Sequence, residues 1–179
     1  MTIKPLIDAS TIAQRVIELA HEITHDYLGK ELVIVPVLKG SYVFAADLVR
    51  HIDLELSVDF LGVRSYGDAQ NSSGVVEITT DLSHSIEGKH VILIEDIVDT
   101  GLTVSYLFKN LTTRRPASLK LASLLHKPSR TREPVKIDYL GFTVEDVFVV
   151  GYGLDHAQKF RNLPYLAVVT DQLPPKASQ

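Results

Sequence analysis

The chain has 179 residues, of which 45% are hydrophobic, so it can bury one substantial core but not two full-sized domains. Its net charge of -4 argues against a surface that holds nucleic acid through a general basic field, so any polyanionic ligand must be met by local groups or a metal. The absence of cysteine excludes disulfides and thiol chemistry, and no apolar stretch is long enough to span a membrane. We therefore expect a single domain over residues 1–179 in a cytoplasmic protein, without nucleic-acid or membrane partners.

The first part of the chain predicts a helix, a strand, a turn and a second helix. Apolar residues recur at helical spacing over 12–27, with Asp8 or Ser10 available as the N-cap. The β-branched run 31–38 is typical of a strand that is covered on both faces. A turn follows this strand, and a helical pattern then continues to about Arg50.

The strand, turn and helix pattern occurs again later in the chain. Residues 90–95 predict a buried strand, 96–101 a loop and 103–111 a helix. Further short strands are predicted at 119–125, 137–140, 147–150 and 166–169. This alternation of strands and helices predicts an α/β fold, in which helices cover both faces of a mostly parallel, twisted sheet.

Two segments stand outside this alternation. Residues 66–74 are small and polar and lie between two strand-like stretches, so we expect a long hairpin loop or a lid there. The tail from Leu173 carries paired prolines and is expected to fray.

The stretch 91–103 carries the most chemical information, because an apolar strand leads directly into acids and a helix start. Glu95, Asp96 and Asp99 are followed by Thr-Gly-Leu-Thr at 100–103. Ligands of open parallel sheets bind at the carboxyl ends of the strands, where this stretch places its polar groups. A glycine turn, two hydroxyl groups and the unpaired N–H groups of a first helical turn can bind an anion. The sequence therefore predicts a phosphate site that lacks the lysine of a Walker loop.

Each part of this motif also has a purely structural explanation. Asp99 or Thr100 can be an N-cap, Gly101 a turn residue, and Glu95 with Asp96 an exposed strand end. The parts occur together, however, and acids at the end of a buried strand cost stability unless they are solvated, paired or used to bind a metal or hydroxyl groups. A binding site explains the combination better than the separate structural roles do.

The motif resembles the 5-phosphoribosyl-1-diphosphate signature of type I phosphoribosyltransferases, and its order is similar to that of the hypoxanthine-guanine branch. Similar segments follow the order of that family at 37–44, 64–66, 124–127, 148–155 and 160–161. The resemblance implies the type I phosphoribosyltransferase fold, with a small hood formed by the N-terminal and C-terminal segments. It also implies purine salvage, in which hypoxanthine or guanine is converted to IMP or GMP with release of diphosphate. Mg²⁺ is the implied metal, and a homodimer or homotetramer is the implied assembly.

The resemblance assigns the binding of 5-phosphoribosyl-1-diphosphate, the phosphoribosyl donor, to the motif and to further segments of the chain. The ribose and 5-phosphate would be bound by Glu95, Asp96, Asp99, Thr100, Gly101, Leu102 and Thr103. Diphosphate would be bound by Lys39, Gly40 and Arg161, and the metal would be held by Glu95, Asp96 and Asp155. A lid that excludes water would begin at Ser65 and Tyr66. Without the resemblance, Asp155 and Arg161 would be ordinary surface charges and Gly40 a turn residue.

The resemblance also implies a site for a 6-oxopurine base. Lys127 would donate a hydrogen bond to the 6-oxo group. Adenine has an amino group at this position, which cannot accept such a hydrogen bond. Phe148 would stack on the base and the backbone of Val149 would contact its edge, although both would otherwise be core residues of a buried strand. Asp99 would be the catalytic residue, which accepts or shares the N7 proton during attack by N9.

Three other interpretations compete with this one. His21-Glu-Ile-Thr-His25 matches the H-E-x-x-H zinc pattern, but Leu28 stands where a metzincin has glycine. A regulator that kept the fold, binds nucleic acid and senses purines is the alternative function, against which the net acidity and the intact acidic motif argue. A nicotinamide-dependent enzyme is disfavoured because no G-x-G-x-x-G follows a strand.

Overall fold

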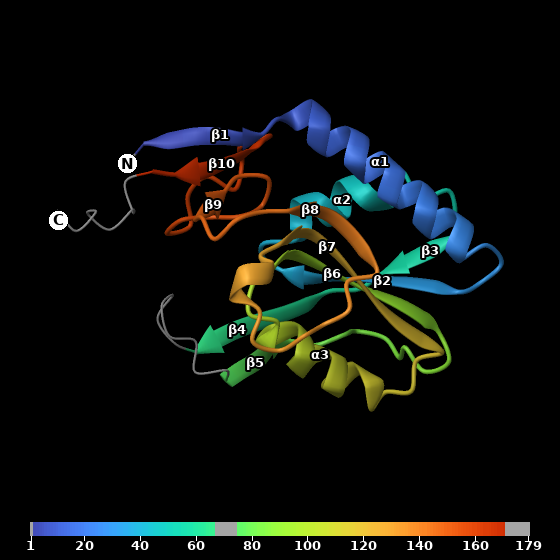
Figure 1. Ribbon diagram of the computed structural model, residues 1–179. Helices are drawn as coiled ribbons and strands as arrows, with labels where there is room; N and C mark the ends of the chain where they lie inside the picture. Colours follow the sequence, from blue (N-terminus) through green and yellow to red (C-terminus); the bar gives the residue numbers. More distant parts are fainter. Residues whose placement is uncertain (1, 67–74, 171–179) are drawn as a thin grey trace.

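The computed structural model of the chain describes residues 2–66 and 75–170 (Figure 1). The expected hairpin tip over 67–74 and the expected frayed tail therefore lie outside the described residues. The elements are β1 (Ile3–Ile7), α1 (Ala9–Asp26), β2 (Leu32–Leu38), α2 (Tyr42–Val49), β3 (Leu56–Val58), β4 (Leu61–Tyr66), β5 (Val75–Thr80), β6 (His90–Val98), α3 (Leu102–Thr112), β7 (Ser118–His126), the 3₁₀ helix η1 (Pro128–Arg130), β8 (Tyr139–Thr143), β9 (Val149–Val150) and β10 (Leu166–Val169).

A seven-stranded sheet forms the body of the molecule. Its order is β5-β4-β2-β6-β7-β8, with β3 paired to β2. The central pairs β2 with β6, β6 with β7 and β7 with β8 are parallel, and only β5 runs antiparallel to its neighbour within this sheet. The expected mostly parallel sheet is thus confirmed.

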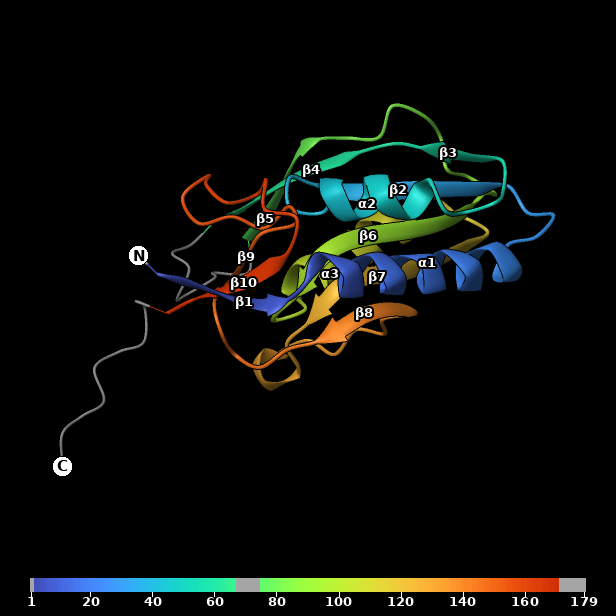
Figure 2. The ribbon, with the colours of Figure 1, turned by 90° about the horizontal axis from the view of Figure 1, so that it is seen from above.

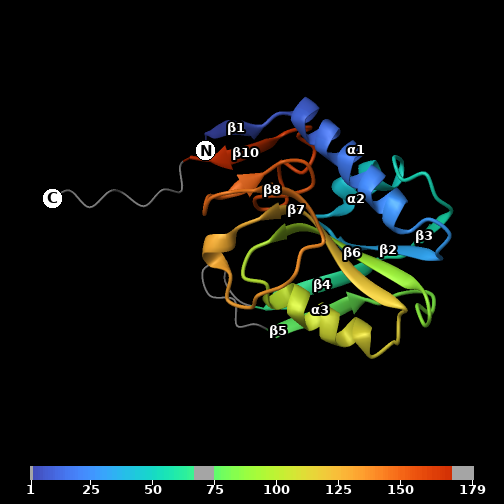
Figure 3. The same ribbon diagram turned by 45° about the vertical axis from the view of Figure 1, so that its right-hand side comes forward.

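Helices cover both faces of this sheet, with α1 and α2 on one side and α3 on the other (Figures 1 and 3). Side chains alternate between the faces of a strand, so Ile92 and Ile94 pack in the cluster with α1 and α2, whereas Val91 and Leu93 pack in the cluster with α3. Every residue from Val91 to Leu93 is fully buried. This two-sided burial explains the continuous apolar run in the sequence.

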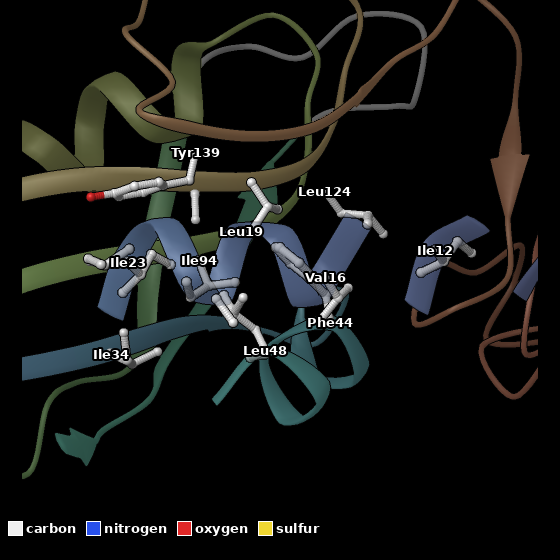
Figure 4. Close-up of a cluster of buried hydrophobic side chains, with 14 of the residues drawn as sticks. Ile12, Val16, Leu19, Ile23, Ile34, Phe44, Leu48, Ile94, Leu124 and Tyr139 are labelled. Carbon is white, nitrogen blue, oxygen red and sulfur yellow. The ribbon is translucent and has the colours of Figure 1, made fainter. Parts of the chain in front are cut away.

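Helix α1 shows how the local sequence builds the larger core. Asp8 caps its N-terminus by accepting a hydrogen bond from Thr11 N at 2.8 Å. Its apolar side chains at helical spacing lie between the strands of the sheet and α2, where Leu19 and Ile23 are completely buried (Figure 4). Truncation of a leucine in such a position to alanine costs about 2–5 kcal/mol, so this stripe is a main source of stability.

A second, three-stranded sheet has the order β1-β10-β9, and all of its pairs are antiparallel. Ile3 lies opposite Val169, which joins strands from the two ends of the chain. In Figures 1 and 2 this small sheet lies beyond one end of the strands of the main sheet. The division of the chain into one domain with a terminal hood stays a prediction.

The structure corrects the expected end of the strand that carries the acidic motif. Strand β6 continues to Val98, whereas a loop was expected from Asp96 onward. The extension is possible because β7 is equally long and pairs with it, Ile97 with Leu125 and Val98 with His126. Separately, no helix within 2–66 and 75–170 is both long and apolar enough to cross a membrane.

Candidate active site

The carboxyl ends of β6 and β7 and the segment around β9 surround a cavity of about 470 Å³. Six residues that the sequence assigns to a site line this cavity: Asp96, Asp99, Lys127, Phe148, Val149 and Asp155. They come from segments that are far apart in the chain, and the parallel pairing of β6 with β7 brings two of these segments together. The rule that ligands bind at the carboxyl ends of parallel strands agrees with this position.

The neighbouring acids Glu95 and Asp96 have different environments. Glu95 is 6% exposed and lines neither this cavity nor the cavity near Lys39 described below. Burial, together with the negative charge of Asp96, raises the pKa of Glu95 well above its usual value. Asp96 lines the cavity, and its own burial raises its pKa to about 6. Of the two acids, only Asp96 is placed to touch a ligand in this cavity.

A second cavity, of about 480 Å³, lies beside the turn that follows β2. Lys39 and Arg161, which the sequence assigns to diphosphate, line it together with Arg64. The peptide bond between Leu38 and Lys39 is cis. Arg64 was part of a family-like segment but was not expected in the site. It lies in β4, two residues beyond Gly62, which pairs with Leu38 at the end of β2. Three cations around one hollow form a suitable environment for a polyanion.

The start of α3 has the geometry expected of an anion site, but it lies outside both cavities. Gly101 has a φ of +80°, and a β-carbon there would lie 2.1 Å from the carbonyl oxygen of Glu133. Only glycine fits this position, because its backbone is left-handed and the backbone of Glu133 lies in contact with it. Thr100, Leu102 and Thr103, also assigned to the donor, line neither cavity.

Asp99 and Lys127 face the same cavity and belong to one group of charges. Lys127 is 8% exposed, and burial lowers the pKa of its ammonium group. Its backbone N donates to Val98 O at 2.9 Å, which ties the end of β7 to the end of β6. Arg130 lies between the acids of this group, with Nε 2.8 Å from Oδ1 of Asp99 and Nη1 3.6 Å from Oδ1 of Asp146. Neither Arg130 nor Asp146 was expected in the site from the sequence.

Asp155 is assigned to the metal and Arg161 to the diphosphate, but here the two side chains form one ion pair. Arg161 Nη2 lies 2.6 Å from Oδ1 of Asp155, and its Nη1 donates to Gly153 O at 2.7 Å. Oδ2 of Asp155 accepts a hydrogen bond from Gln158 N at 2.7 Å. These contacts fix the loop after β9 and place its acid and its arginine at the boundary of the two cavities.

The residues assigned to the purine and the lid have contrasting positions. Phe148 is 37% exposed, and its ring meets His156 edge to face with centroids 5.3 Å apart. Val149 is buried and pairs with Val168 in the small sheet. Ser65 and Tyr66 end β4, and the remainder of the expected lid lies outside the described residues. Phe148 is therefore the assigned aromatic that presents an open surface to the cavity.

The acidic side chains at the cavity suit a magnesium ion that is bound partly by the substrate. They suit a metal that is held by protein side chains alone less well. Within the described ranges, no group of three or more histidine, cysteine or acidic side chains could hold a metal. Asp96 and Asp155 line the same cavity, and the charge of Asp155 contributes to the raised pKa of Asp96. Mg²⁺ is commonly held by one or two carboxylates, waters and substrate phosphates. The zinc pattern on α1 has no such support, because His21 is exposed and the side chain of His25 is 92% exposed.

The chain is similar to known proteins over most of its length. Residues 4–157 match the family model for the phosphoribosyl transferase domain. The chain is 47% identical over 166 residues to the hypoxanthine-guanine phosphoribosyltransferase of Bacillus subtilis (strain 168), covering 93% of this chain and 92% of that protein. It is 44% identical over 170 residues to the longer bifunctional protein TilS/HprT of Listeria innocua, covering 95% of this chain and 26% of that protein. A solved hypoxanthine phosphoribosyltransferase from Staphylococcus aureus has a TM-score of 0.90 and 42% identity, covering 93% of this chain and 91% of that chain.

Proposed function

The chain belongs to the phosphoribosyl transferase family, and we propose that it is a hypoxanthine-guanine phosphoribosyltransferase of purine salvage. It transfers 5-phosphoribosyl from 5-phosphoribosyl-1-diphosphate to hypoxanthine or guanine, which gives IMP or GMP and diphosphate. The observation that carries this proposal is the cavity in which Asp99, Lys127 and Phe148 meet at the carboxyl ends of the parallel strands. The alternative of a regulator that binds nucleic acid has no support from the Bacillus subtilis and Staphylococcus aureus relatives, which are both named as phosphoribosyltransferases.

The base lies in the cavity between Phe148 and Lys127 in this proposal. The exposed ring of Phe148 stacks on the purine, and the backbone of Val149 contacts its edge. Lys127 donates a hydrogen bond to the 6-oxo group, and its burial makes that bond strong because water does not compete with it. Adenine presents an amino group at the same position, so it leaves the buried ammonium group without an acceptor.

The donor extends from this cavity toward the cationic one. Asp96 binds the ribose hydroxyls, while the turn at Gly101 and the first turn of α3 bind the 5-phosphate through N–H groups and threonine hydroxyls. Lys39, Gly40 and Arg161 bind the diphosphate, and Arg64 adds a positive charge to the same cavity. Glu95 supports Asp96 from within the sheet, because it is too buried to reach the substrate in this conformation.

The reaction forms a bond between purine N9 and the anomeric carbon, while the bond from that carbon to the diphosphate oxygen breaks. The electron pair of the broken bond leaves with diphosphate, where the cations at Lys39 and Arg161 stabilise the growing negative charge. Asp99 accepts the N7 proton of the base, which removes the positive charge that the attack creates on the purine. Its position in the same cavity as Lys127 and Phe148 supports this role.

Mg²⁺ is the metal of the proposal, and it supplies charge neutralisation of the diphosphate when bound. Asp96 and Asp155 are the residues that would hold it, because their carboxylates line the cavity near the ribose and diphosphate positions. The third assigned ligand, Glu95, would act through Asp96. A cytoplasmic location and a homodimeric or homotetrameric assembly are further parts of this proposal.

An assay with a panel of bases tests the function. Purified protein is incubated with 5-phosphoribosyl-1-diphosphate, Mg²⁺ and hypoxanthine, guanine, xanthine or adenine, and nucleotide formation is followed. We expect turnover of hypoxanthine and guanine, little or none of adenine, and loss of turnover in excess EDTA that returns with added Mg²⁺. Turnover of adenine at the rate of hypoxanthine would contradict the proposed role of the cavity.

A further inference from the structure

The guanidinium group of Arg130 lies against the carboxylate that accepts the proton in the proposed reaction. Its Nε is 2.8 Å from Oδ1 of Asp99. We propose that Arg130 is a positioning residue, which fixes the Asp99 carboxylate so that its other oxygen faces the purine N7. This inference rests on the proposed function, because it deepens the account of the same site.

The two oxygens of Asp99 have different surroundings. Oδ1 is shielded from solvent and has no hydrogen-bond partner within the described part of the chain, so the nearby charge of Arg130 is what holds it. The Asp99 side chain as a whole is 37% exposed, which leaves Oδ2 as the accessible oxygen toward the cavity. A carboxylate that is held at one oxygen has one preferred orientation, and proton transfer depends steeply on such orientation.

The segment that carries Arg130 is itself fixed to the segment that carries Asp99. Thr100 O accepts hydrogen bonds from Arg132 N and Glu133 N, each at 3.0 Å. Arg130 N donates to Lys127 O at 3.1 Å, which places Arg130 at the end of the short helix η1. The backbone that carries Arg130 is therefore hydrogen-bonded to the loop that carries Asp99.

A second acid lies near another nitrogen of the Arg130 guanidinium group. Asp146 Oδ1 lies 3.6 Å from Nη1 of Arg130 and 3.9 Å from Nζ of Lys127. Asp99, Arg130, Asp146 and Lys127 all line the cavity, but Asp146 is 52% exposed, so its contacts are weak. Asp99 is thus the main partner of Arg130. Arginine suits the position, because its planar group can meet two acids at once and a lysine ammonium group cannot do so at the same geometry.

The test is a double-mutant cycle between the two residues. Arg130→Ala and Arg130→Lys are prepared in the wild-type chain, Arg130→Ala is also prepared in an Asp99→Asn chain, and kcat and KM are measured with radiolabelled hypoxanthine. We expect Arg130→Ala to lower kcat about tenfold or more with KM for the donor changed less than about threefold, and Arg130→Lys to restore part of the loss. In the Asp99→Asn chain, Arg130→Ala should change kcat less than about twofold, because the group that it positions is no longer a proton acceptor.

Arg132→Ala is the matched control, because it removes an exposed arginine from the same segment and keeps its backbone N–H. Melting temperatures are compared for all variants, and Arg130→Gln replaces Arg130→Ala in the cycle if the alanine variant is unfolded at the assay temperature. Equal losses of kcat in both backgrounds, or a loss confined to KM for the donor, would overturn the positioning role while the proposed function stands. Absence of turnover in the wild-type protein would instead overturn the proposed function and this inference with it.

Discussion

The backbone of Gly40 lies so close to Asp96 that a β-carbon on Gly40 would be 1.6 Å from Oδ2 of that carboxylate. The turn after β2 and the end of β6 therefore fit together only because residue 40 has no side chain. Gly153 also lies close to this turn, since a β-carbon there would lie 2.2 Å from Gly40 O. The proposed ribose, diphosphate and metal positions thus meet at one closely packed point.

We expect Gly40→Ala to displace the Asp96 carboxylate and to lower kcat/KM for the donor about 10–100-fold, the scale of a displacement of about 1 Å at a reacting centre. The clash should also lower stability by about 1–3 kcal/mol. Adding Asp96→Ala should recover most of that stability, because it removes the atoms that clash, although it should not recover activity. Urea unfolding of the two single variants and the double variant measures the loss of unfolding free energy in each. A loss in the double variant equal to the sum of the two single losses would count against the contact.

Lys127→Met removes the buried ammonium group with little change in volume. A hydrogen bond to a charged group contributes about 1.5–3 kcal/mol, so we expect kcat/KM for hypoxanthine to fall about 10–100-fold, while the already poor use of adenine changes less. Competition between the two bases in one reaction gives the selectivity directly. Lys136→Met is the control, because that side chain is 84% exposed and lies outside the cavity. If the preference of Lys127→Met for hypoxanthine over adenine were unchanged, another group would recognise the 6-oxo position.

Arg161→Lys tests the joint role of the loop after β9. A lysine cannot contact Gly153 O and Asp155 together as the guanidinium group does, so the donor should bind about tenfold more weakly. Isothermal titration calorimetry with 5-phosphoribosyl-1-diphosphate and Mg²⁺ measures the affinity. Arg115→Lys serves as control, because that side chain is 77% exposed on another part of the surface. Equal affinities of Arg161→Lys and wild type would remove Arg161 from the donor site.

Asp26 should make the protein sensitive to acid in a defined range. Its hydrogen bonds from Tyr139 Oη at 2.6 Å and Lys120 Nζ at 3.1 Å lower its pKa to about 2. Because this folded-state pKa lies below the usual value of 3.8, the contribution to stability is complete above about pH 4 and is lost as the pH falls toward 2. The side chain is 41% exposed, so solvent screening limits the contribution to about 1 kcal/mol.

Urea unfolding of wild type and Asp26→Asn at pH 7, 4 and 3 tests this expectation. The free energy of unfolding of the variant should be lower than that of wild type at pH 7. The difference between the two free energies should be smaller at pH 3. Asp53→Asn, the same substitution at an exposed aspartate, is the control. A difference that stays constant down to pH 3 would mean that shape and hydrogen bonding, rather than charge, give Asp26 its role.

The sequence predicted individual helices and strands well where the signal is local. Strand β10 was expected at 166–169 and has these bounds. The apolar stripe of α1 was expected with its cap at Asp8 or Ser10, and Asp8 is the N-cap. Strand β1 was missed because Lys4 and Pro5 interrupt its apolar pattern. Its partner β10 lies at the other end of the chain, so the pairing that makes β1 a strand is invisible in a local window.

The candidate site was predicted as a group of residues, but its internal contacts were not. The position of Asp96, Asp99 and Lys127 followed from the rule for parallel sheets, since each lies near the carboxyl end of β6 or β7. The burial of Glu95 could have been suspected, because adjacent residues of a strand face opposite sides and two neighbouring acids cannot share one environment. The contact of Arg130 with Asp99 depends on how loops after different strands approach each other, which residue spacing does not determine.

The most direct test of the account compares nucleotide formation by wild type and Asp99→Ala, with hypoxanthine, 5-phosphoribosyl-1-diphosphate and Mg²⁺. Calorimetry on the same preparations verifies that each protein still binds the donor. The account predicts turnover by the wild type, and a loss of about 10²–10⁴-fold in kcat for Asp99→Ala with the donor still bound. Turnover of Asp99→Ala within a few-fold of wild type would contradict the assignment of the proton acceptor. A wild-type protein that binds the donor but forms no nucleotide with any 6-oxopurine would contradict the proposed function itself.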